Sequence, residues 1–579
     1  MSSDTSLNTG LWRMFAIALV LTFGFSVVLS QLVRYQVVQH EELTVRAIEQ
    51  RDAERDVPPR RGTIVDANGF VLAMNLTQWD ISASPSLVFY PDEAATELSA
   101  LLNLPREEVY AKLMAEDPWL RLAISVPQEV GEAILDLNYS GITCEPYPLR
   151  MFTEGPLFAH VLGIVTKAGD GFYGVEGYYN PDLKGSDGKL VYERDAYGRQ
   201  LPLPPEEQSQ PKPGTSLILT VDRYIQYIAA TELERAVAEY DAESGTVVVM
   251  DPRTGAILAI TSYPTYDPND FADTDLDVAA DPSVSSLWEP GSIFKIITWS
   301  GALDAGVISP GLTVYDDGAI EVGGRIIRNW DRQGHGHVTM TDGLVQSLNT
   351  VAAYISTTMG KDRFYNYLRR FGFGSLTGVD LSSEGPGMMK LPGDSNWFPS
   401  ELGTNSFGQG IAVTPMQMIT AVSAVANRGL LMKPYIVQQL VNTDPETGET
   451  QITKREPMIV RAAISQEAAE TMTYMLTEVI EEGATKAQVP GYRIAGKTGT
   501  AQIPTAYGYH PTDTIASFVG YAPADDPRFI VLVKLDKPTA SPWGSQTAAP
   551  TFRAIAERLF VYMQIPPDEI RLALGQEGP

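Results

Sequence analysis

Cysteine is nearly absent from this sequence. Cys144 is the only cysteine among 579 residues, so the chain can form neither an internal disulfide nor a cluster of thiolate metal ligands. Histidine is scarce as well, with five in the whole chain. His335 and His337 flank one glycine, but no cysteine or carboxylate spacing completes a metal site there. We therefore expect a polar loop at this position and no bound metal.

Basic residues are also in the minority. The chain has 43 Lys and Arg against 71 Asp and Glu, which gives a formal net charge of −28. Binding to nucleic acid requires positive charge that neutralises phosphates, so we expect no nucleic-acid partner and interpret the acidity as favouring solubility. Hydrophobic residues make up 44% of the chain. This fraction allows buried cores, and the length allows two or three domains.

One apolar run, residues 14–33, has the length of a single membrane span. A cleaved signal peptide is the alternative, but the run is long for one, so we favour a retained anchor that follows a short tail, residues 1–13. Arg13 precedes the run, whereas Arg34, Arg46 and Arg51 follow it closely. The basic residues therefore leave the orientation of the anchor open.

The order of predicted elements indicates an α+β fold. Residues 58–73 read as strand, Asn-Gly turn and strand, and residues 202–214 are rich in Pro, Glu and Gln, as in a linker or boundary. Beyond them we predict strands at 245–250, 256–262, 492–501, 515–521 and 529–535, and helices at 222–240, 292–306, 472–480 and 552–563. Short turns join the last three strands, which favours antiparallel pairing. The pattern predicts one central antiparallel sheet flanked by helices.

The chemistry is centred on the stretch from Glu289 to Lys295, Glu-Pro-Gly-Ser-Ile-Phe-Lys. An apolar run follows Gly291, so we expect Ser292 at the start of a buried helix and Lys295 one turn later on the same face. A hydroxyl beside a lysine of lowered pKa forms a nucleophile and base pair. The same Ser-x-x-Lys spacing at Ser186 lies in a glycine-rich stretch, and a capping serine beside a solvated lysine is the commoner meaning of this spacing.

Two further short motifs follow along the chain. Ser347-Leu348-Asn349 supplies a second hydroxyl and an amide, which can relay a proton and bind a substrate amide; a simple cap is the alternative. Lys497-Thr498-Gly499-Thr500 lies in a predicted strand. A glycine inside a strand suits a close backbone approach, such as a peptide substrate added alongside, although a tight turn near a strand end is the alternative.

Together these motifs resemble the penicillin-binding protein and serine β-lactamase superfamily, whose signature is Ser-x-x-Lys, Ser-x-Asn and Lys-Thr-Gly in this order. One departure is Leu348, where many members carry serine. Other stretches narrow the resemblance to the class B penicillin-binding proteins, the monofunctional D,D-transpeptidases: residues 61–66, 174–177, 219–222, 249–255, 289–292, 408–410 and 414–415.

The resemblance implies roles for the site residues. Ser292 attacks the carbonyl between the two terminal D-alanines of a peptidoglycan stem peptide, and Lys295 takes its proton. Ser347 carries a proton to the leaving D-alanine, and Asn349 holds the peptide. The substrate carboxylate is bound by Lys497, Thr498 and Thr500 around Gly499. The backbone N–H groups of Ser292 and Thr500 form the oxyanion hole.

The resemblance also implies partners and location. We expect a cytoplasmic tail at 1–13, the anchor at 14–33, a pedestal of the penicillin-binding protein dimerisation type at 34–212, a transpeptidase domain at 213–567 and a tail at 568–579. The catalytic domain lies outside the cytoplasmic membrane. Its ligands are stem peptides and β-lactam antibiotics, and its partner is a glycosyltransferase of the shape, elongation, division and sporulation family. The resemblance implies no cofactor.

Two other functions remain open from the sequence. One is a β-lactamase or D,D-carboxypeptidase of the same fold, and the other is a non-catalytic β-lactam sensor or scaffold. The intact set of serines and lysines disfavours a scaffold, which has no need of them. The choice between division, elongation and sporulation lies beyond the sequence.

Overall fold

The computed structural model describes residues 5–193, 206–272, 274, 276–445, 447–505 and 508–576. The chain divides into two compact units. One consists of Met1–Pro59 with Ser186–Lys212, and the other of Arg60–Gly185 with Pro213–Pro579. The predicted linker at 202–214 lies partly outside the described residues, and its described part includes strand β9.

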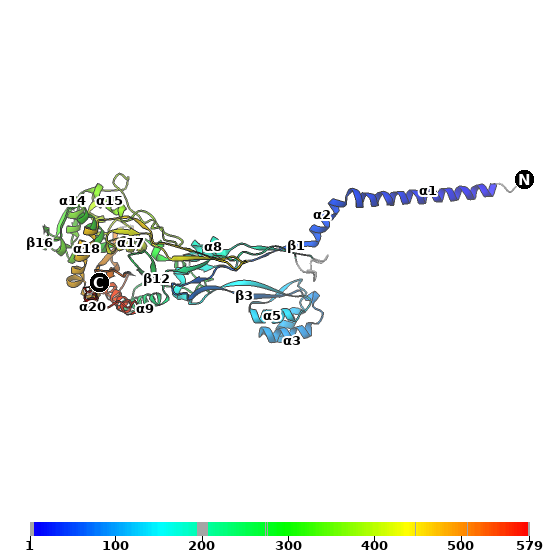
Figure 1. The fold of residues 1–579 in the computed structure, drawn as a ribbon, viewed down its shortest axis with the longest axis horizontal. Helices are drawn as coiled ribbons and strands as arrows, with labels where there is room; N and C mark the ends of the chain where they lie inside the picture. Colours follow the sequence, from blue (N-terminus) through cyan, green and yellow to red (C-terminus); the bar gives the residue numbers. More distant parts are fainter. Residues whose placement is uncertain are drawn as a thin grey trace. The chain divides into compact units, whose positions relative to one another are not determined.

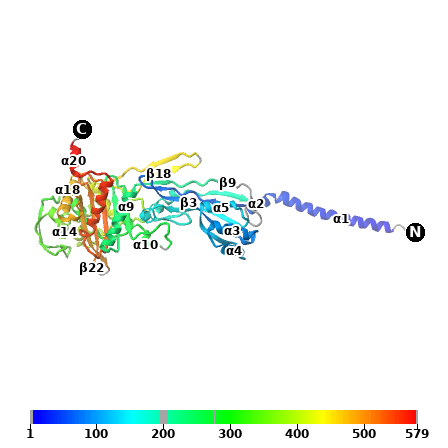
Figure 2. The same ribbon diagram turned by 90° about the horizontal axis from the view of Figure 1, so that it is seen from below.

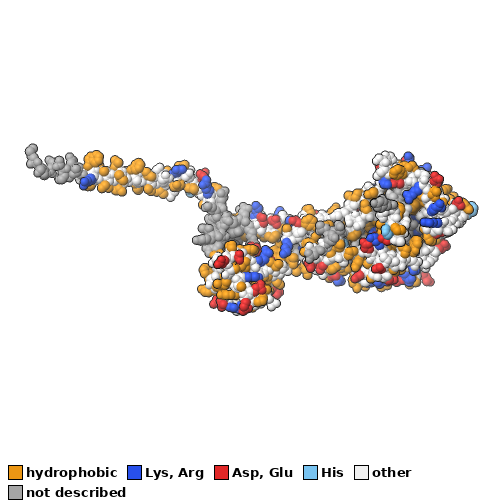
Figure 3. Space-filling model, turned by 180° about the vertical axis from the view of Figure 1, so that it is seen from behind, with side chains coloured by type: hydrophobic (Ala, Val, Ile, Leu, Met, Phe, Trp, Pro, Cys, Tyr) orange, Lys and Arg blue, Asp and Glu red, His pale blue; other side chains and the backbone are white. Residues whose placement is uncertain are grey.

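The first unit contains the apolar helix α1, Thr5–Val33, which includes the predicted anchor. Residues Gly10–Val38 are long and apolar enough to cross a membrane, with a mean hydropathy of 2.2, and hydrophobic side chains run along this helix in Figure 3. Helix α2, His40–Arg51, follows. A small antiparallel sheet completes the unit in the order β1 (Asp52–Val57), β8 (Gly188–Glu193) and β9 (Glu206–Ser209).

The second unit contains two large sheets. In the first, the predicted hairpin at 58–73 is confirmed, because β2 (Ile64–Val65) and β3 (Val71–Ala83) pair antiparallel across the turn at Gly69. Strands β4 (Leu120–Pro127) and β5 (Ile142–Phe152) pair with β3. Helices α3 (Pro91–Leu102), α4 (Arg106–Leu113) and α5 (Gln128–Asp136) enclose a small core against them (Figure 1).

The same sheet also recruits strands from much later in the chain. Strand β10 (Ser216–Leu219) pairs with β2 on one side and with β18 (Val437–Thr443) on the other, and β19 (Thr450–Lys454) pairs with β18. The hairpin of β18 and β19 therefore belongs to a sheet whose other strands come from residues 64–219. The sequence gives no sign of this, because the hairpin is mostly polar and its partners lie more than two hundred residues earlier.

The second large sheet is antiparallel throughout, as predicted. Its order is β12 (Ile257–Tyr263), β11 (Ser244–Met250), β23 (Phe529–Asp536), β22 (Gly508–Ala522) and β21 (Ala495–Thr505). Both faces are buried, which explains the continuous β-branched run in β11: Val247 and Val249 enter one core and Val248 enters the other. The hairpin of β21 and β22 extends beyond the predicted strand ends, and Pro504, Thr505 and Gly508 in this extension are exposed.

Helices cover both faces of this sheet, which confirms the predicted α+β arrangement. Helices α9 (Arg223–Tyr240) and α19 (Ala548–Tyr562) pack on one face. Helices α12 (Lys295–Asp304), α17 (Pro415–Ala426) and α18 (Gln466–Glu478) belong to the core of the other. Figure 2 shows α9 and α18 on opposite sides of the strands. The segment between α12 and α17 adds β13 (Thr313–Asp316), β14 (Ala319–Val322), β15 (Arg325–Arg328), β16 (Gly336–Thr339), α13 (Met340–Val345), α14 (Asn349–Met359) and α15 (Lys361–Arg370).

Candidate active site

Ser292 lies in a short 3-10 turn, Gly291–Phe294, and helix α12 begins only at Lys295. The prediction that the helix starts at Ser292 is therefore wrong by one turn. Gly291, which precedes Ser292, has a φ of 58°, a left-handed backbone that favours glycine. A Cβ at Gly291 would lie 3.1 Å from the Cβ of Ala501. The turn thus packs tightly against β21, and this contact brings Ser292 beside the third motif.

The ammonium nitrogen of Lys295 joins the first two motifs. Its Nζ lies 3.2 Å from Ser292 Oγ, 3.2 Å from Ser347 Oγ and 2.9 Å from Asn349 Oδ1. It also donates to the Ser347 carbonyl oxygen at 2.7 Å. Among the described residues, none of its hydrogen-bond acceptors is a carboxylate. The structure therefore brings together four of the residues that the sequence singled out.

Ser347 occupies the break between α13 and α14 with a left-handed φ of 58°. Such a backbone is unfavourable for residues with a side chain and persists where the surroundings enforce it. Here it lets both the carbonyl oxygen and the hydroxyl of Ser347 meet Lys295 Nζ. Asn349 opens α14, and its Nδ2 donates to the carbonyl oxygen of Arg328 at 3.1 Å.

The third motif lies in β21, as predicted. Lys497 is 1% exposed, and its Nζ donates to the carbonyl oxygen of Thr498 at 3.3 Å. A Cβ at Gly499 would lie 2.4 Å from Ser517 Oγ on the neighbouring strand, so packing within the protein already requires glycine here. Thr500 Oγ1 accepts a hydrogen bond of 3.1 Å from the backbone N–H of Gly544. This bond ties the loop after β23 to the motif.

Both lysines are buried, and burial changes their acidity. Burial and the positive charge of Lys497 lower the pKa of Lys295 well below its ordinary value. Burial also lowers the pKa of Lys497, to about 8. A neutral Lys295 can accept a proton from a hydroxyl, whereas Lys497 keeps its positive charge at neutral pH. The pair thus offers a base and a fixed cation in one site.

The motifs line one cavity of about 430 Å³, a volume typical of a small-molecule or peptide site. Ser292, Ser347, Asn349, Lys497, Thr498 and Thr500 all contribute to its wall. Lys295 lies behind this wall and reaches Ser292 Oγ from the protein side. Among the described residues that line the cavity, none is an aspartate or a glutamate.

Two tryptophans of the cavity were missed by the sequence analysis. Trp330 follows β15 and Trp543 follows β23, and their rings meet edge to face with centroids 5.7 Å apart. They are 59% and 45% exposed. The only sequence signal was a large aromatic residue in each of two polar loops, and such a signal is too weak to identify a site.

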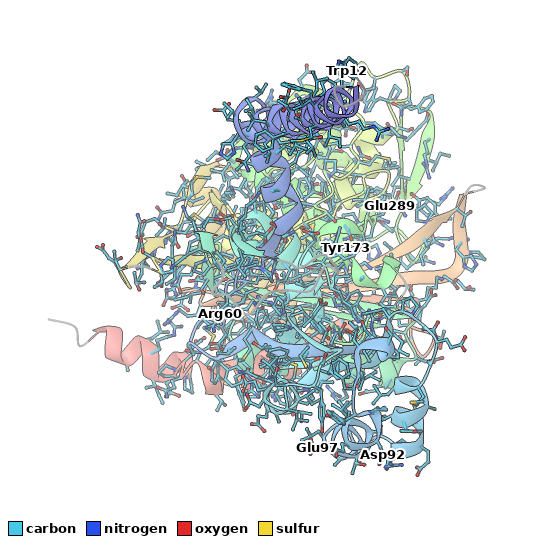
Figure 4. All side chains as sticks on the ribbon, turned by 90° about the vertical axis from the view of Figure 1, so that its right-hand side faces the viewer. Trp12, Arg60, Asp92, Glu97, Tyr173 and Glu289 are labelled. Carbon is cyan, nitrogen blue, oxygen red and sulfur yellow. The ribbon has the colours of Figure 1, made fainter. Side chains whose placement is uncertain are left out.

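Glu289 takes no part in the lining of the cavity. Its carboxylate accepts from the Gly410 N–H and from the Tyr509 hydroxyl, each at 2.9 Å, and burial raises its pKa. Glu289, labelled in Figure 4, therefore braces the loop of Gly410 and the β21–β22 hairpin. The described residues contain no group of three His, Cys, Asp or Glu side chains that could hold a metal.

Comparison with known proteins agrees with these motifs. The family model of the penicillin binding protein transpeptidase domain matches residues 245–557, and that of the penicillin-binding protein dimerisation domain matches residues 56–219. Stage V sporulation protein D of Bacillus subtilis is 36% identical over 541 residues, covering 92% of this chain and 83% of that protein. Peptidoglycan D,D-transpeptidase FtsI of Escherichia coli is 27% identical, covering 96% of this chain and 93% of that protein.

Solved structures give the same result. Penicillin-binding protein 2X from Streptococcus thermophilus matches with a TM-score of 0.78 and 25% identity over 89% of this chain and 80% of that one. Penicillin-binding protein 3 from Mycobacterium tuberculosis in complex with aztreonam matches with a TM-score of 0.69 and 27% identity over 89% of this chain and 98% of that one. The fold, the motifs and these matches together show that the chain belongs to the penicillin-binding protein transpeptidase family, in its class B branch.

Proposed function

We propose that this protein is a membrane-anchored peptidoglycan D,D-transpeptidase that forms an acyl-enzyme on Ser292 and is inhibited by β-lactams. The observation that carries the proposal is the position of Lys295. Its side chain is fully buried, its Nζ lies 3.2 Å from both Ser292 Oγ and Ser347 Oγ, and no carboxylate holds its charge among its described hydrogen-bond acceptors. Relatives named as peptidoglycan D,D-transpeptidases support the reaction class.

Acylation follows from this geometry. Neutral Lys295 removes the proton of Ser292 Oγ, and the oxygen attacks the carbonyl carbon between two terminal D-alanines. The N–H groups of Ser292 and Thr500 stabilise the oxyanion, where one such donor contributes about 2.7–4 kcal/mol. The proton passes through Ser347 Oγ to the departing D-alanine nitrogen, and the C–N bond breaks. Asn349 orients Lys295 and the peptide.

Substrate recognition falls to the third motif. The terminal carboxylate of the donor binds to the positive charge of Lys497 and to the hydroxyls of Thr498 and Thr500, while Gly499 keeps the strand flat. An amine of a second stem peptide then attacks the ester, so that a cross-link forms and Ser292 is released. A penicillin has the same carboxylate and an acylating carbonyl, which explains how it competes for this cavity.

We infer the location from the proposed substrate and the apolar helix, and the partner from the family resemblance. We place residues 1–13 in the cytoplasm and the catalytic domain, residues 213–567, outside the membrane, where peptidoglycan lies. Residues 34–212 form the pedestal. A membrane glycosyltransferase of the shape, elongation, division and sporulation family supplies the glycan strands. The test is polymerisation of lipid-linked precursor by the purified protein alone, and robust glycan synthesis without a partner would contradict this assignment.

Labelled penicillin tests the catalytic assignment. Ser292→Ala should abolish labelling and leave the fold intact, because the loss of one hydroxyl from a turn costs only about 1 kcal/mol. Ser186→Ala is the matched control, since Ser186 has the same Ser-x-x-Lys spacing but lies in the other compact unit. Labelling that survives Ser292→Ala but is lost in Ser186→Ala would overturn the assignment.

A further inference from the structure

We propose that Trp330 and Trp543 form the site that receives the acceptor amine as a cation, and that they thereby select amines over water and hydroxyl nucleophiles. This inference rests on the proposed function, because it concerns the second half of the same reaction. Three features of the cleft lead to it: the attachment of the two indoles, the charges of the lining residues and the exposure of the rings.

The two tryptophans are attached to different walls of the cavity, Trp330 through its indole and Trp543 through the backbone of the next residue. Trp330 Nε1 donates to the carbonyl oxygen of Gln346, the residue before Ser347, at 3.3 Å. Trp543 precedes Gly544, whose N–H donates to Thr500 Oγ1 at 3.1 Å. A side chain on Gly544 is excluded, because its Cβ would lie 2.2 Å from the carbonyl oxygen of Gly499. The wall of the second motif and the wall of the third motif thus each hold one tryptophan at a fixed place.

The charges of the cleft pose a problem for the acceptor. A side-chain amine such as that of lysine has a pKa of about 10.4, and it reaches the enzyme as a cation. Lys497 is positively charged at neutral pH, since its pKa is about 8, and it repels a cation that enters deeply. Among the described lining residues no carboxylate offers compensation. The electron-rich faces of exposed aromatic rings attract an ammonium group without a counter-charge.

The tryptophan pair has the properties that this role requires. Trp is the best aromatic partner of an ammonium group. The two rings meet edge to face, which leaves face area free, and they remain 59% and 45% exposed. They also line the cavity that contains Ser292. A cation held between cleft and solvent can lose its proton to water and advance as a neutral nucleophile.

The transfer consumes one acceptor amine and regenerates the free enzyme. The acceptor R–NH3+ loses one proton to solvent, and its nitrogen attacks the ester carbon on Ser292. The new C–N bond forms as the bond from carbon to Ser292 Oγ breaks. The second amine proton passes through Lys295 to Ser292 Oγ, which restores the free hydroxyl. No oxidant, reductant or further reactant is needed.

The inference is tested in the full-length protein by measuring how the acyl-enzyme divides between transfer to an acceptor and hydrolysis by water. A short thioester donor acylates Ser292, and the adduct is offered D-alanine or D-lactate. Both carry a carboxylate, but D-alanine has a cationic ammonium group where D-lactate has a neutral hydroxyl. The readout is the ratio of transfer product to hydrolysis product. This ratio does not depend on the rate at which the acyl-enzyme forms.

Two substitutions of different chemistry separate attraction of a cation from simple apolar contact. Trp543→Leu and Trp330→Leu keep an apolar side chain without a ring, and each should lower the D-alanine ratio about threefold to tenfold. Trp543→Phe and Trp330→Phe keep a ring and should retain most of the ratio. The D-lactate ratio should change less than about twofold, since no cation is involved. Trp119→Leu is the control, because Trp119 is 55% exposed and lies between α4 and β4.

The outcomes are distinct. Equal losses for Leu and Phe, or an equal loss for D-lactate, would show apolar contact only and overturn the inference. If neither tryptophan substitution changes the ratio of transfer to hydrolysis, the inference is overturned while the proposed function stays intact. Failure of the wild-type protein to form any acyl-enzyme would overturn the proposed function and this inference with it.

Discussion

The second compact unit contains two clusters of buried ionisable side chains, which differ in whether a counter-charge is present. In the first, Glu176 is fully buried and its two oxygens contact Arg61 and Arg150, at 2.5 and 2.7 Å. In the second, Lys295 and Lys497 are equally buried, but none of their described hydrogen-bond acceptors is a carboxylate. Paired charges hold segments of the chain together, whereas burial without a counter-charge lowers the pKa of a lysine, which allows Lys295 to act as a base.

The comparison shows where stability and chemistry are separated. The Arg61–Glu176–Arg150 cluster joins β5, helix α7 (Gly174–Tyr178) and the segment before β2. The lysine cluster joins α12, the Ser347 break and β21. Loss of a charge from the first should weaken the fold, and loss of a charge from the second should weaken the reaction.

The largest expected effect is on the reaction. Lys295→Met replaces the base with an apolar side chain of similar length, and the rate of acylation by penicillin should fall about 10²- to 10⁴-fold. The thermal midpoint should change little, because the buried amine of Lys295 is neutral and an apolar side chain of similar length fills the same space. Stopped-flow acylation and thermal unfolding measure the two quantities. A strongly lowered thermal midpoint with a retained acylation rate would show that Lys295 serves the fold and not the reaction.

The next effect concerns the fold. Glu176→Gln leaves two buried guanidinium groups without their counter-charge, which should destabilise the protein by about 3–5 kcal/mol. The acylation rate of the folded fraction should remain near that of the wild type. Glu239→Gln, which breaks the exposed pair of Glu239 with Arg235 on α9, is the control and should change stability by less than about 1 kcal/mol. An equal loss of stability in Glu176→Gln and Glu239→Gln would show that the buried cluster contributes no more to stability than an exposed ion pair.

The pH dependence sharpens the difference between the two lysines. Lys295 must be neutral, so acylation rises with pH through its lowered pKa. Lys497 must be charged, and it loses its proton above about pH 8. Acylation should therefore decline above that pH, by about tenfold when the charged hydrogen bond to the carboxylate is lost. Lys497→Arg should shift this decline to higher pH. A wild-type profile that still rises above pH 9 would contradict the assigned roles.

The three motifs could be identified from the sequence, whereas the backbone conformation and the aromatic side chains around them could not. Ser292, Lys295 and Lys497 could be assigned because each motif lies within a few residues of chain and matches a known order. The left-handed Ser347 could not be predicted, because the strain is imposed by packing between α13 and α14. Trp330 and Trp543 come from loops without periodicity.

The fold shows the same limit. The antiparallel sheet of β11, β12 and β21–β23 could be predicted from β-branched runs joined by short turns. The pairing of β18 with β10 could not, because it joins distant segments and the hairpin carries no strong alternation. The glycine at 499 was expected to admit the substrate backbone, and packing against Ser517 gives it a second, internal cause.

The smallest expected effect concerns the hairpin beside the site. Tyr509→Phe removes the hydroxyl that donates to Glu289 at 2.9 Å, and it should weaken the attachment of the hairpin by about 1 kcal/mol. Amide exchange at positions 502 and 509 of the hairpin should become about fivefold faster than in the wild type, with little change in acylation. Mass-spectrometric hydrogen exchange measures this. Unchanged exchange would mean that strand pairing alone fixes the hairpin.

The most direct test of the central claim is the lifetime of the penicillin adduct. A β-lactamase with a Ser-x-Asn motif uses a carboxylate base to activate water against its ester, and no described lining residue of this cavity is a carboxylate. The account therefore predicts a mass increase on the Ser292 peptide that persists for many minutes, with negligible penicillin turnover. Turnover of many equivalents per second without a lasting adduct would contradict it and identify a hydrolase.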